Sequence, residues 1–354
     1  GNFANLLTQA AAVIVIAMGL VFVLLIGEID LSAGYASGVC SAVLVILVTK
    51  NDQPWYLALT ASIIVGCVLG YLIGILVARL GIPSFVVTLA SFLAFQGILL
   101  LLAGEGGTIR IEDKTVLAIE NSNLSVSASW LFFIVVSAIY FLSGLARINS
   151  RRKAGLKTEL KKLWLIKTLA LIGASGLAVL TLNLERSNNP DLVSLKGIPY
   201  VVPLILAILV VGTFVLDRTA FGRHIYAVGG NAEAARRAGI NVKRIRIACF
   251  MICSGLSAIA GLIFASRQNS VSPTTGGSST LLYAVGAAVI GGTSLFGGKG
   301  KMRDAILGGL VVAVIDNGMG LLGYAAGIKF IVTGLVLLTS ASVDAISRRG
   351  VANS

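Results

Sequence analysis

The sequence predicts an all-α fold, and within that class a polytopic transmembrane helical bundle. Of its 354 residues, 56% are hydrophobic and only 12% are charged, whereas a soluble globular domain has roughly 25% charged residues. The charges are also clustered, so apolar runs remain that supply the ~20 helical residues needed to cross a hydrocarbon core of about 30 Å. These two observations exclude the soluble globular classes.

Eleven apolar runs have the length and composition of membrane spans. One of them, 281–296, is short and contains Gly286, Gly291 and Gly292. It is therefore expected either to span as a short helix or to re-enter the side from which it came. The eleven runs, in order, are 6–26, 31–48, 55–79, 83–103, 130–146, 163–182, 199–216, 245–266, 281–296, 304–322 and 328–346.

Loop charges set the orientation, because the cytoplasmic loops of membrane proteins are rich in Lys and Arg. The basic loops near 147–162 and 217–244 are predicted to be cytoplasmic, and the acidic or neutral loops near 104–129 and 183–198 external. The C-terminal tail is also basic, so an odd number of spans places the first residue outside. We therefore expect a further N-terminal helix ahead of this chain, and a single transmembrane permease domain over residues 1–354.

Composition also bears on cofactors and partners. The net charge is +13, but basic cytoplasmic loops explain this excess, so no nucleic-acid partner is expected. The four cysteines lie inside apolar runs, which predicts small buried side chains rather than disulfides. Cys249 and Cys253 share a helix face, but no histidine or carboxylate stands near them to complete a metal site. The stretch "VIGGTSLFGGKGKMRD" (289–304) fails as a phosphate-binding loop, because Thr293 replaces the first glycine and Gly300 replaces the final Ser or Thr. No enzyme activity or cofactor is expected.

The segment "LLIGEIDLSAGYASG" (24–38) places Glu28 and Asp30 between two apolar runs. An ionised Asp at the bilayer centre costs about 2.5–3.5 kcal/mol on insertion scales. The helix is therefore expected to break here, with its backbone facing protein or water. Asp30, followed by Ser32, is a good N-cap for a helix starting near Leu31. Direct contact with a transported substrate is the alternative, and the two roles are compatible.

The segment "NAEAARRAG" (231–239) has the signals of a short helix. Asn231 is a good N-cap and Glu233 suits the first turn. Arg236 suits the C-terminal end, and Gly239 ends the helix. Two turns are unstable alone in water, so the helix must pack on the protein's own cytoplasmic ends or in a cytoplasmic partner. The residues assigned to this element, including two glycines expected to give a sharp bend at its start, are Gly229, Gly230, Asn231, Glu233, Ala235, Arg236 and Gly239.

A second interruption lies at 290–298, where Gly291 and Gly292 end an apolar run and a cationic stretch follows. The segments "IGEIDLSAG" (26–34) and "IGGTSLFGG" (290–298) match at four of nine positions. Paired interruptions of this kind are typical of transporters built from internal repeats. Gly-rich turns also resemble each other by chance, and both explanations remain open at this level.

Asp316 and Asn317 lie inside the predicted span 304–322. An intramembrane carboxylate faces the protein interior or an aqueous path by default. These two residues therefore either line the translocation path or form a hydrogen bond between helices, and we hold both possibilities equally. The full set of candidate path and break residues is Asp30, Ser32, Gly291, Gly292, Asp316 and Asn317.

The segment "GRHIYAVGGNAEAARRAGI" is similar to the coupling region of sugar-importing ATP-binding-cassette permeases, the ribose/xylose-type integral membrane subunits. "GEIDLSAG", "IPSFVVTLASFLAFQGILL", "VIGGTSLFGG" and "DNGMGLLG" resemble the same family in the expected order, so the resemblance covers nearly the whole chain. The basic loop and extra hydrophobic segment at 147–182 look most like the xylose-permease branch. Glu28 is a departure, because the family often has a second glycine at that position.

The resemblance implies a permease subunit in a bacterial cytoplasmic membrane that translocates a monosaccharide, a xylose-like pentose, with ATP bound by a separate cytoplasmic ATPase. It implies that the helix at 231–239 inserts into a groove of that ATPase. It also implies a homodimer of permease chains and an extracytoplasmic sugar-binding protein. That protein would contact the predicted external loops, which are 49–54, 104–129, 183–198 and 267–280.

Two other classes of function compete with this one. A proton-coupled secondary sugar transporter would use Asp30 and Asp316 as proton carriers, but it leaves the short basic helix unexplained. An intramembrane enzyme would need a catalytic group, and His224, the sole histidine of the sequence, lies in a basic loop without a partner nucleophile. Uptake that depends on ATP would indicate the importer, whereas uptake that is abolished by an ionophore would indicate the proton-coupled transporter.

Overall fold

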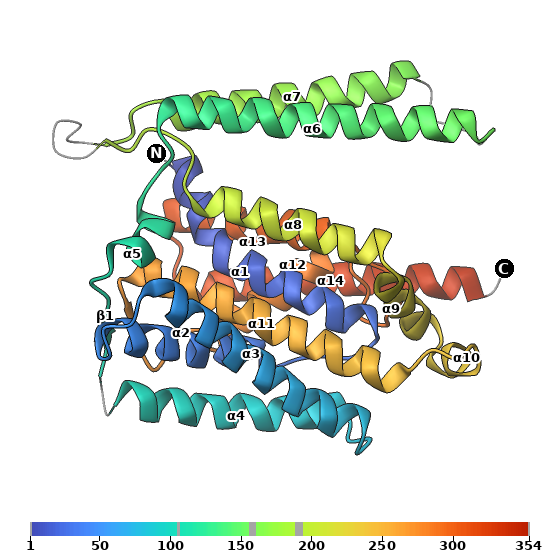
Figure 1. The fold of residues 1–354 in the computed structure, drawn as a ribbon, viewed down its shortest axis with the longest axis horizontal. Coiled ribbons are helices and arrows are strands. Elements are labelled where there is room, and N and C mark those ends of the chain that lie inside the picture. Colours follow the sequence, from blue (N-terminus) through green and yellow to red (C-terminus); the bar gives the residue numbers. More distant parts are fainter. Residues whose placement is uncertain (1, 105–106, 156–160, 188–193, 353–354) are drawn as a thin grey trace. The chain divides into compact units, whose positions relative to one another are not determined.

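The computed structural model of the chain describes residues 2–104, 107–155, 161–187 and 194–352 (Figure 1). This part holds fourteen helices and two short strands. The helices are α1 (Asn2–Leu25), α2 (Ala33–Thr49), α3 (Trp55–Ala78), α4 (Ser84–Ala103), α5 (Lys114–Asn121), α6 (Val126–Lys153), α7 (Lys161–Asn183), α8 (Val201–Arg218), α9 (Ala220–Gly230), α10 (Ala232–Arg237), α11 (Val242–Gln268), α12 (Ser278–Ile290), α13 (Met302–Leu321) and α14 (Ala326–Ala352). The strands are β1 (Ile109–Arg110) and β2 (Ser270–Val271).

Each of the eleven predicted spans overlaps a helix of the structure. Nine helices within the described ranges are long and apolar enough to cross a membrane. The two shorter ones are α2 and α12, with 17 and 13 residues, or about 25 and 20 Å at 1.5 Å per residue. Each borders one of the predicted interruptions. The prediction of an all-α bundle with broken helices is confirmed.

Three predicted boundaries are wrong by six residues or more, and one of them is the end of α14, which lies at Ala352 rather than at residue 346. Helix α12 ends at Ile290 rather than continuing to residue 296, because the chain turns at Gly291 and Gly292. Helix α6 continues to Lys153, so the predicted cytoplasmic loop 147–162 begins as a helix. Arg and Lys are good helix formers and are favoured in a last turn, which explains the extension. Of the loops used to predict orientation, residues 105–106, 156–160 and 188–193 lie outside the described residues.

The chain forms two compact units. The first comprises residues 122–200 with the first four residues, and the second comprises 5–121 and 201–354. In the first unit α6 packs against α7, with the rings of Phe141 and Trp164 5.4 Å apart. The ends of this unit are joined by backbone hydrogen bonds such as that from Leu124 N to Ile198 O, 2.8 Å.

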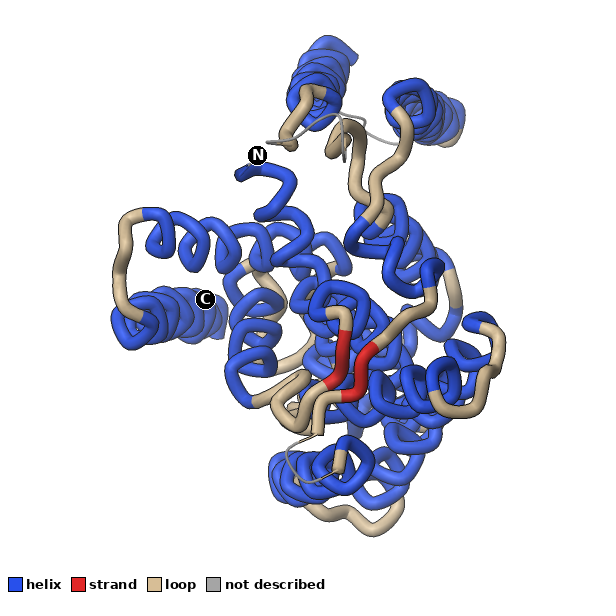
Figure 2. Tube along the Cα trace, turned by 90° about the vertical axis from the view of Figure 1, so that its left-hand side faces the viewer, coloured by secondary structure: helices blue, strands red, loops and turns tan. Residues whose placement is uncertain are grey.

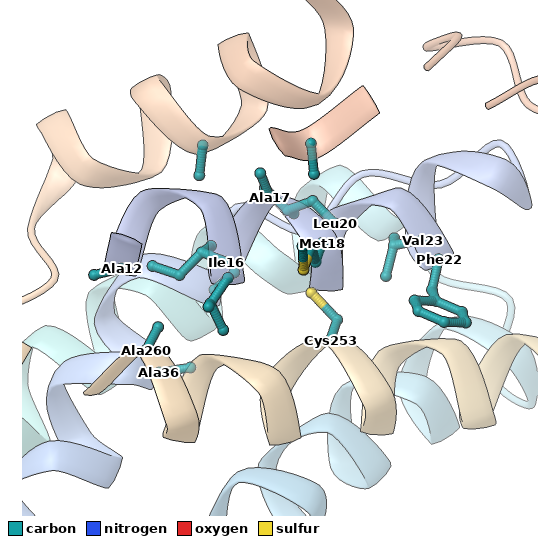
Figure 3. Close-up of a cluster of buried hydrophobic side chains, with 14 of the residues drawn as sticks. Ala12, Ile16, Ala17, Met18, Leu20, Phe22, Val23, Ala36, Cys253 and Ala260 are labelled. Carbon is teal, nitrogen blue, oxygen red and sulfur yellow. The ribbon is translucent and has the colours of Figure 1, made fainter. Parts of the chain in front are cut away.

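Helix α1 lies at the centre of the second unit. It is apolar on all faces, as expected for a helix surrounded by protein, and every residue from Ala10 to Ile26 except Val13 is buried. Figure 3 shows its side chains, among them Met18, meeting Cys253 of α11. Because α1 is enclosed, its C-terminal end is fixed by its neighbours, and that end leads directly into the first interruption.

Helices α3 and α11 pack against each other along a row of glycines. The sequence "GCVLGYLIG" places Gly66, Gly70 and Gly74 on one face of α3. A Cβ on Gly66 would lie 2.5 Å from Ser254 O, and one on Gly74 would lie 2.7 Å from the Cα of Ile247. Small residues at this spacing let helix backbones approach closely in a membrane. Helix α11 is therefore held firmly along its length.

Candidate coupling site

Helices α9 and α10 form an elbow between the long helices α8 and α11. The Asn231 side chain caps α10 by accepting from Ala234 N at 2.9 Å, which confirms the predicted N-cap. Helix α9, however, runs through Gly229 and Gly230, so the predicted sharp bend at these glycines is wrong. The bend occurs at Asn231, which has extended backbone angles.

Helix α10 presents its charges outward. Glu233 Oε2 lies 3.2 Å from Arg236, and Arg237 lies 3.5 Å from Glu233 Oε1, with the two arginine side chains 66% and 81% exposed. Ala235 is buried beneath them. The helix ends in a Schellman motif, since Gly239 has φ +84° and its N–H donates to Arg236 O. The predicted end at Gly239 is confirmed, and the exposed face is free of the protein's own packing.

Gly229 lets the elbow pack closely against the C-terminal end of α1. A Cβ at this position would collide with Leu25 O and would lie 2.6 Å from Gly298 N. Gly298 N in turn donates to Leu25 O at 2.8 Å. A Cβ on Gly297 would lie 2.8 Å from Gly229 O and 2.9 Å from Gly27 N. The elbow therefore touches both interruptions, 26–32 and 291–301, which we call break 1 and break 2.

Break 1 follows a Schellman motif at the end of α1. Gly27 has φ +76°, its N–H donates to Leu24 O at 2.9 Å, and Glu28 N donates to Val23 O at 3.1 Å. Glycine suits this left-handed position because it has no Cβ. The predicted interruption at residues 27–30 is confirmed.

Asp30 stabilises break 1, but not as the N-cap of a helix at Leu31. Helix α2 begins two residues later at Ala33, with Ser32 in the N-cap position. Asp30 Oδ1 accepts from Ser32 N at 2.9 Å and from Ser32 Oγ at 2.6 Å. The short Asp side chain bonds the backbone two residues on and so makes a turn before the helix. Asp30 Oδ2 is buried without a hydrogen-bond partner among the described residues, and the Cys253 thiol lies beside the carboxyl group.

Break 2 repeats the ending of break 1. Gly292 has φ +118°, its N–H donates to Val289 O at 3.0 Å, and Thr293 N donates to Ala288 O at 3.0 Å. This is again a Schellman motif with glycine in the left-handed position. Gly291, the residue before it, packs so closely on α13 that a Cβ would collide with Asp304 O.

The turns inside the two breaks also correspond. Phe296 N donates to Ser294 Oγ at 3.2 Å, just as Ser32 N donates to Asp30 Oδ1. Asp30 and Ser294 occupy equivalent positions when segments 26–34 and 290–298 are aligned. The left-handed glycines Gly27 and Gly292 are offset by one residue in this alignment, so the hydrogen bonds do not decide between an internal repeat and chance similarity.

Sequence reading missed Asp304, which closes break 2. Its Oδ2 accepts from Lys301 N at 2.7 Å and from Thr293 Oγ1 at 3.2 Å. It thus forms the return half of a capping box at the start of α13. The available signal was an acidic residue three positions after the last cation of "GGKGK" and directly ahead of an apolar run.

Asp316 and Asn317 both contact neighbouring helices. Asp316 Oδ1 lies 3.8 Å from Lys329 Nζ of α14, and Asn317 Nδ2 donates to Gln9 Oε1 of α1 at 3.4 Å. These contacts support the helix-to-helix role of the pair. Lys329 was missed, although a lysine inside the apolar run 328–346 already indicates a buried partner.

The loops predicted to be external meet at the C-terminal end of α11. Strand β1 pairs with β2 antiparallel (Figure 2), and Thr49 Oγ1 donates to Arg110 O at 3.2 Å. These contacts join three of the four loops predicted to receive a binding protein, 49–54, 104–129 and 267–280. The fourth, 183–198, belongs to the first unit.

Helix α5 is fixed to the last turn of α11 through Ser266. Ser266 Oγ accepts from Glu120 N at 3.0 Å and donates to Leu117 O at 3.0 Å, and Ser266 O accepts from Asn121 Nδ2 at 2.8 Å. Glu120 is buried beside this contact, and loss of water raises the pKa of its carboxyl from 4.5 to about 8, with Arg267 acting in the opposite direction. Within the described ranges, no group of three or more His, Cys, Asp or Glu side chains could hold a metal ion.

Comparison with known proteins agrees with the resemblance seen in the sequence. A family model described as "Branched-chain amino acid transport system / permease component" matches residues 2–341. The xylose transport system permease protein XylH of Escherichia coli (strain K12) is 37% identical over 350 residues, which cover 98% of this chain and 86% of that protein. XylH of Haemophilus influenzae is 34% identical, over 98% of this chain and 90% of its own length.

The ribose import permease protein RbsC of Haemophilus influenzae is 28% identical, over 97% of this chain and 84% of that protein. No solved structure matches the chain. The predicted resemblance to sugar permeases is confirmed by these relatives. The chain is a multi-pass protein of the cytoplasmic membrane and belongs to the transport-system permease family represented by the branched-chain amino acid permease component model.

Proposed function

We propose that this chain is the membrane subunit of an ATP-binding-cassette importer that carries a monosaccharide, a xylose-like pentose, across the cytoplasmic membrane. The xylose and ribose permeases among its relatives support the substrate class. One observation of the structure carries the mechanism. The outward-facing helix α10 is joined through Gly229 to both helix breaks, so a partner that moves α10 also moves the two interrupted segments.

The partner at α10 is the ATPase subunit. The exposed face of α10 is charged on Glu233, Arg236 and Arg237, and it would seat in a groove of the ATPase, with Gly229, Gly230, Asn231 and Ala235 on the side of the elbow. Closure of the ATPase then displaces the elbow as a rigid body. ATP is bound by that partner.

The residues that we place along the sugar translocation path lie in the two breaks and on helix α13. Asp30 and Ser32 in break 1, and Gly291 and Gly292 in break 2, allow these segments to change direction, while Asp316 and Asn317 hold α13 to its neighbours. A neutral sugar needs hydrogen-bonding groups but no fixed buried charge. Two copies of the chain would enclose one path, and an extracytoplasmic binding protein would deliver sugar at the paired external loops.

The test is ATP-driven uptake of labelled xylose and ribose by the permease, ATPase and binding protein in proteoliposomes. Arg236→Glu is expected to lower uptake and ATPase co-purification while the chain still inserts. Arg79→Glu is the control substitution, because Arg79 is an exposed arginine at the C-cap of α3, outside helices α9 and α10. Normal uptake in Arg236→Glu would contradict the docking of α10.

A proton-coupled carrier remains the second candidate, because the buried Asp30 carboxyl has a free Oδ2 among the described residues. Asp30→Asn distinguishes the two. The amide oxygen still accepts from Ser32 N, so an ATP-driven importer retains most of its uptake, whereas a proton carrier loses its titratable group and its uptake. Asp30→Leu should reduce uptake in either case, and a protonophore should stop uptake by the carrier alone.

A further inference from the structure

Break 1 is attached to the elbow at a second point, on the far side of α10. Glu28 Oε1 lies 3.2 Å from Arg246 Nη2, with the two side chains 13% and 30% exposed. Glu28 follows Gly27 in break 1, and Arg246 lies in the second turn of α11. The Nε of Arg246 is buried and has no hydrogen-bond partner in the described part of the chain, so the guanidinium is held there by Glu28 alone.

Helix stability does not explain this arginine. Lys243, Arg244 and Arg246 lie in the first two turns of α11, where the helix dipole disfavours cations. Arg244 is exposed, whereas Arg246 turns inward to Glu28. Removing either member of a largely buried ion pair is costly, because the other member is left as an uncompensated charge. The pair therefore resists separation of Glu28 from Arg246.

The linker between α10 and α11 is hydrogen-bonded almost continuously. Gly239 N donates to Arg236 O, Ile240 N to Ala235 O and Val242 N to Ile240 O, at 3.0, 3.0 and 2.9 Å. Asn241 then caps α11 by accepting from Arg244 N at 3.0 Å. Helix α10 and the first turns of α11 therefore move together as one body.

Residues 25–28 are thus contacted by one residue that precedes α10 in the chain and by another that follows it. Gly229, ahead of α10, packs on Leu25 O, and Arg246, beyond α10, pairs with Glu28. One attachment permits rotation of break 1 against the elbow, whereas two attachments fix its direction. We propose that Glu28 and Arg246 are positioning residues that carry the displacement of α10 into break 1 and hence to the start of α2. This inference rests on the proposed function.

The test compares Glu28→Gln, Arg246→Gln and the exchanged pair Glu28→Arg with Arg246→Glu, each reconstituted with the ATPase and the binding protein. The two single variants should keep the ATPase bound and hydrolysing ATP but lower the sugar transported per ATP about tenfold, within the 5- to 150-fold range typical of coupling between sites. The exchanged pair should regain most of this ratio. Arg244→Gln, two residues before Arg246 but exposed, is the matched control and should behave as the wild type.

Single variants that match the Arg244→Gln control overturn the inference, and so does an exchanged pair that stays uncoupled at normal protein amounts. If the single variants insert poorly, the exchanged pair and Arg246→Lys decide, because both keep the opposite charges. Both must then couple as the wild type does. Failure of the proposed function is distinguishable, since the wild-type protein itself would then show no ATP-driven uptake.

Discussion

Glu120 should make the attachment of α5 to α11 depend on pH. Glu120 is 8% exposed, and burial raises the pKa of its carboxyl from 4.5 to about 8. The folded protein therefore keeps the proton to about pH 8, whereas the carboxyl in detached or unfolded chain loses it near pH 4.5. Since the folded state binds more protons in this window, stability falls as pH rises from about 4.5 to about 8 and is level above it.

The magnitude follows from the width of the window. Each pH unit below the folded pKa contributes about 1.4 kcal/mol, so the free energy of unfolding should fall by roughly 2–3 kcal/mol between pH 6 and pH 8. Glu120→Gln carries no titratable group but keeps the size and the backbone hydrogen bond to Ser266 Oγ. The variant should therefore match the wild type near pH 5 and exceed it at pH 8.

The assay is thermal unfolding in lipid nanodiscs at pH 5, 6, 7 and 8, followed by tryptophan fluorescence. The measured quantity is the difference in melting temperature between wild type and Glu120→Gln at each pH, because other titrating groups cancel in it. We expect this difference to grow by roughly 3–4 °C from pH 6 to pH 8. Glu112→Gln, at an exposed position of the same loop, is the control for the substitution itself. A constant difference for Glu120→Gln would refute the raised pKa.

Three further predictions concern packing. Gly229→Ala should lower sugar uptake, because the added Cβ displaces the elbow from the end of α1. Gly230→Ala should not lower it, because a Cβ at that position meets nothing within 4 Å. The measurement for both variants is uptake per inserted protein. Lys329→Met should lower the melting temperature by leaving Asp316 unpaired in an apolar span, and adding Asp316→Leu should restore it. Ser266→Ala removes two hydrogen bonds of α5, so it should weaken the attachment by about 1–3 kcal/mol and speed amide hydrogen exchange over 114–121.

The long apolar helices could be predicted because hydropathy alone decides which segments leave water. Asn231 and Gly239 were assigned correctly for a similar reason, since a cap and a Schellman glycine are local features with local sequence signals. The start of α2 was placed two residues early, because Asp and Ser both favour the N-cap position, and the competition between Asp30 and Ser32 is settled by the turn that precedes the helix.

Long-range contacts could not be read from the sequence. The role of Gly229 depends on Leu25, about two hundred residues earlier in the chain, and Arg246 finds Glu28 at a similar separation. Gly229 was noticed but interpreted as a bend, because a glycine needed for close packing and a glycine needed for a turn look alike in one sequence. Lys329 was overlooked, since a search for carboxylates in the spans ignores the cation that pairs with them.

The enclosure of α1 has a consequence for synthesis of the protein. Gly19 of α1 packs on Cys253 of α11, and Gly309 of α13 packs on Ile14, so the neighbours that cover α1 are translated more than two hundred residues after it. At 5–20 residues per second, the delay is roughly 10–50 s. During that time α1 must lie against lipid, which its apolar circumference permits because lipid tails and aliphatic side chains are equally apolar. Helices α11 and α13, which are made much later than α1, thus complete the core around it.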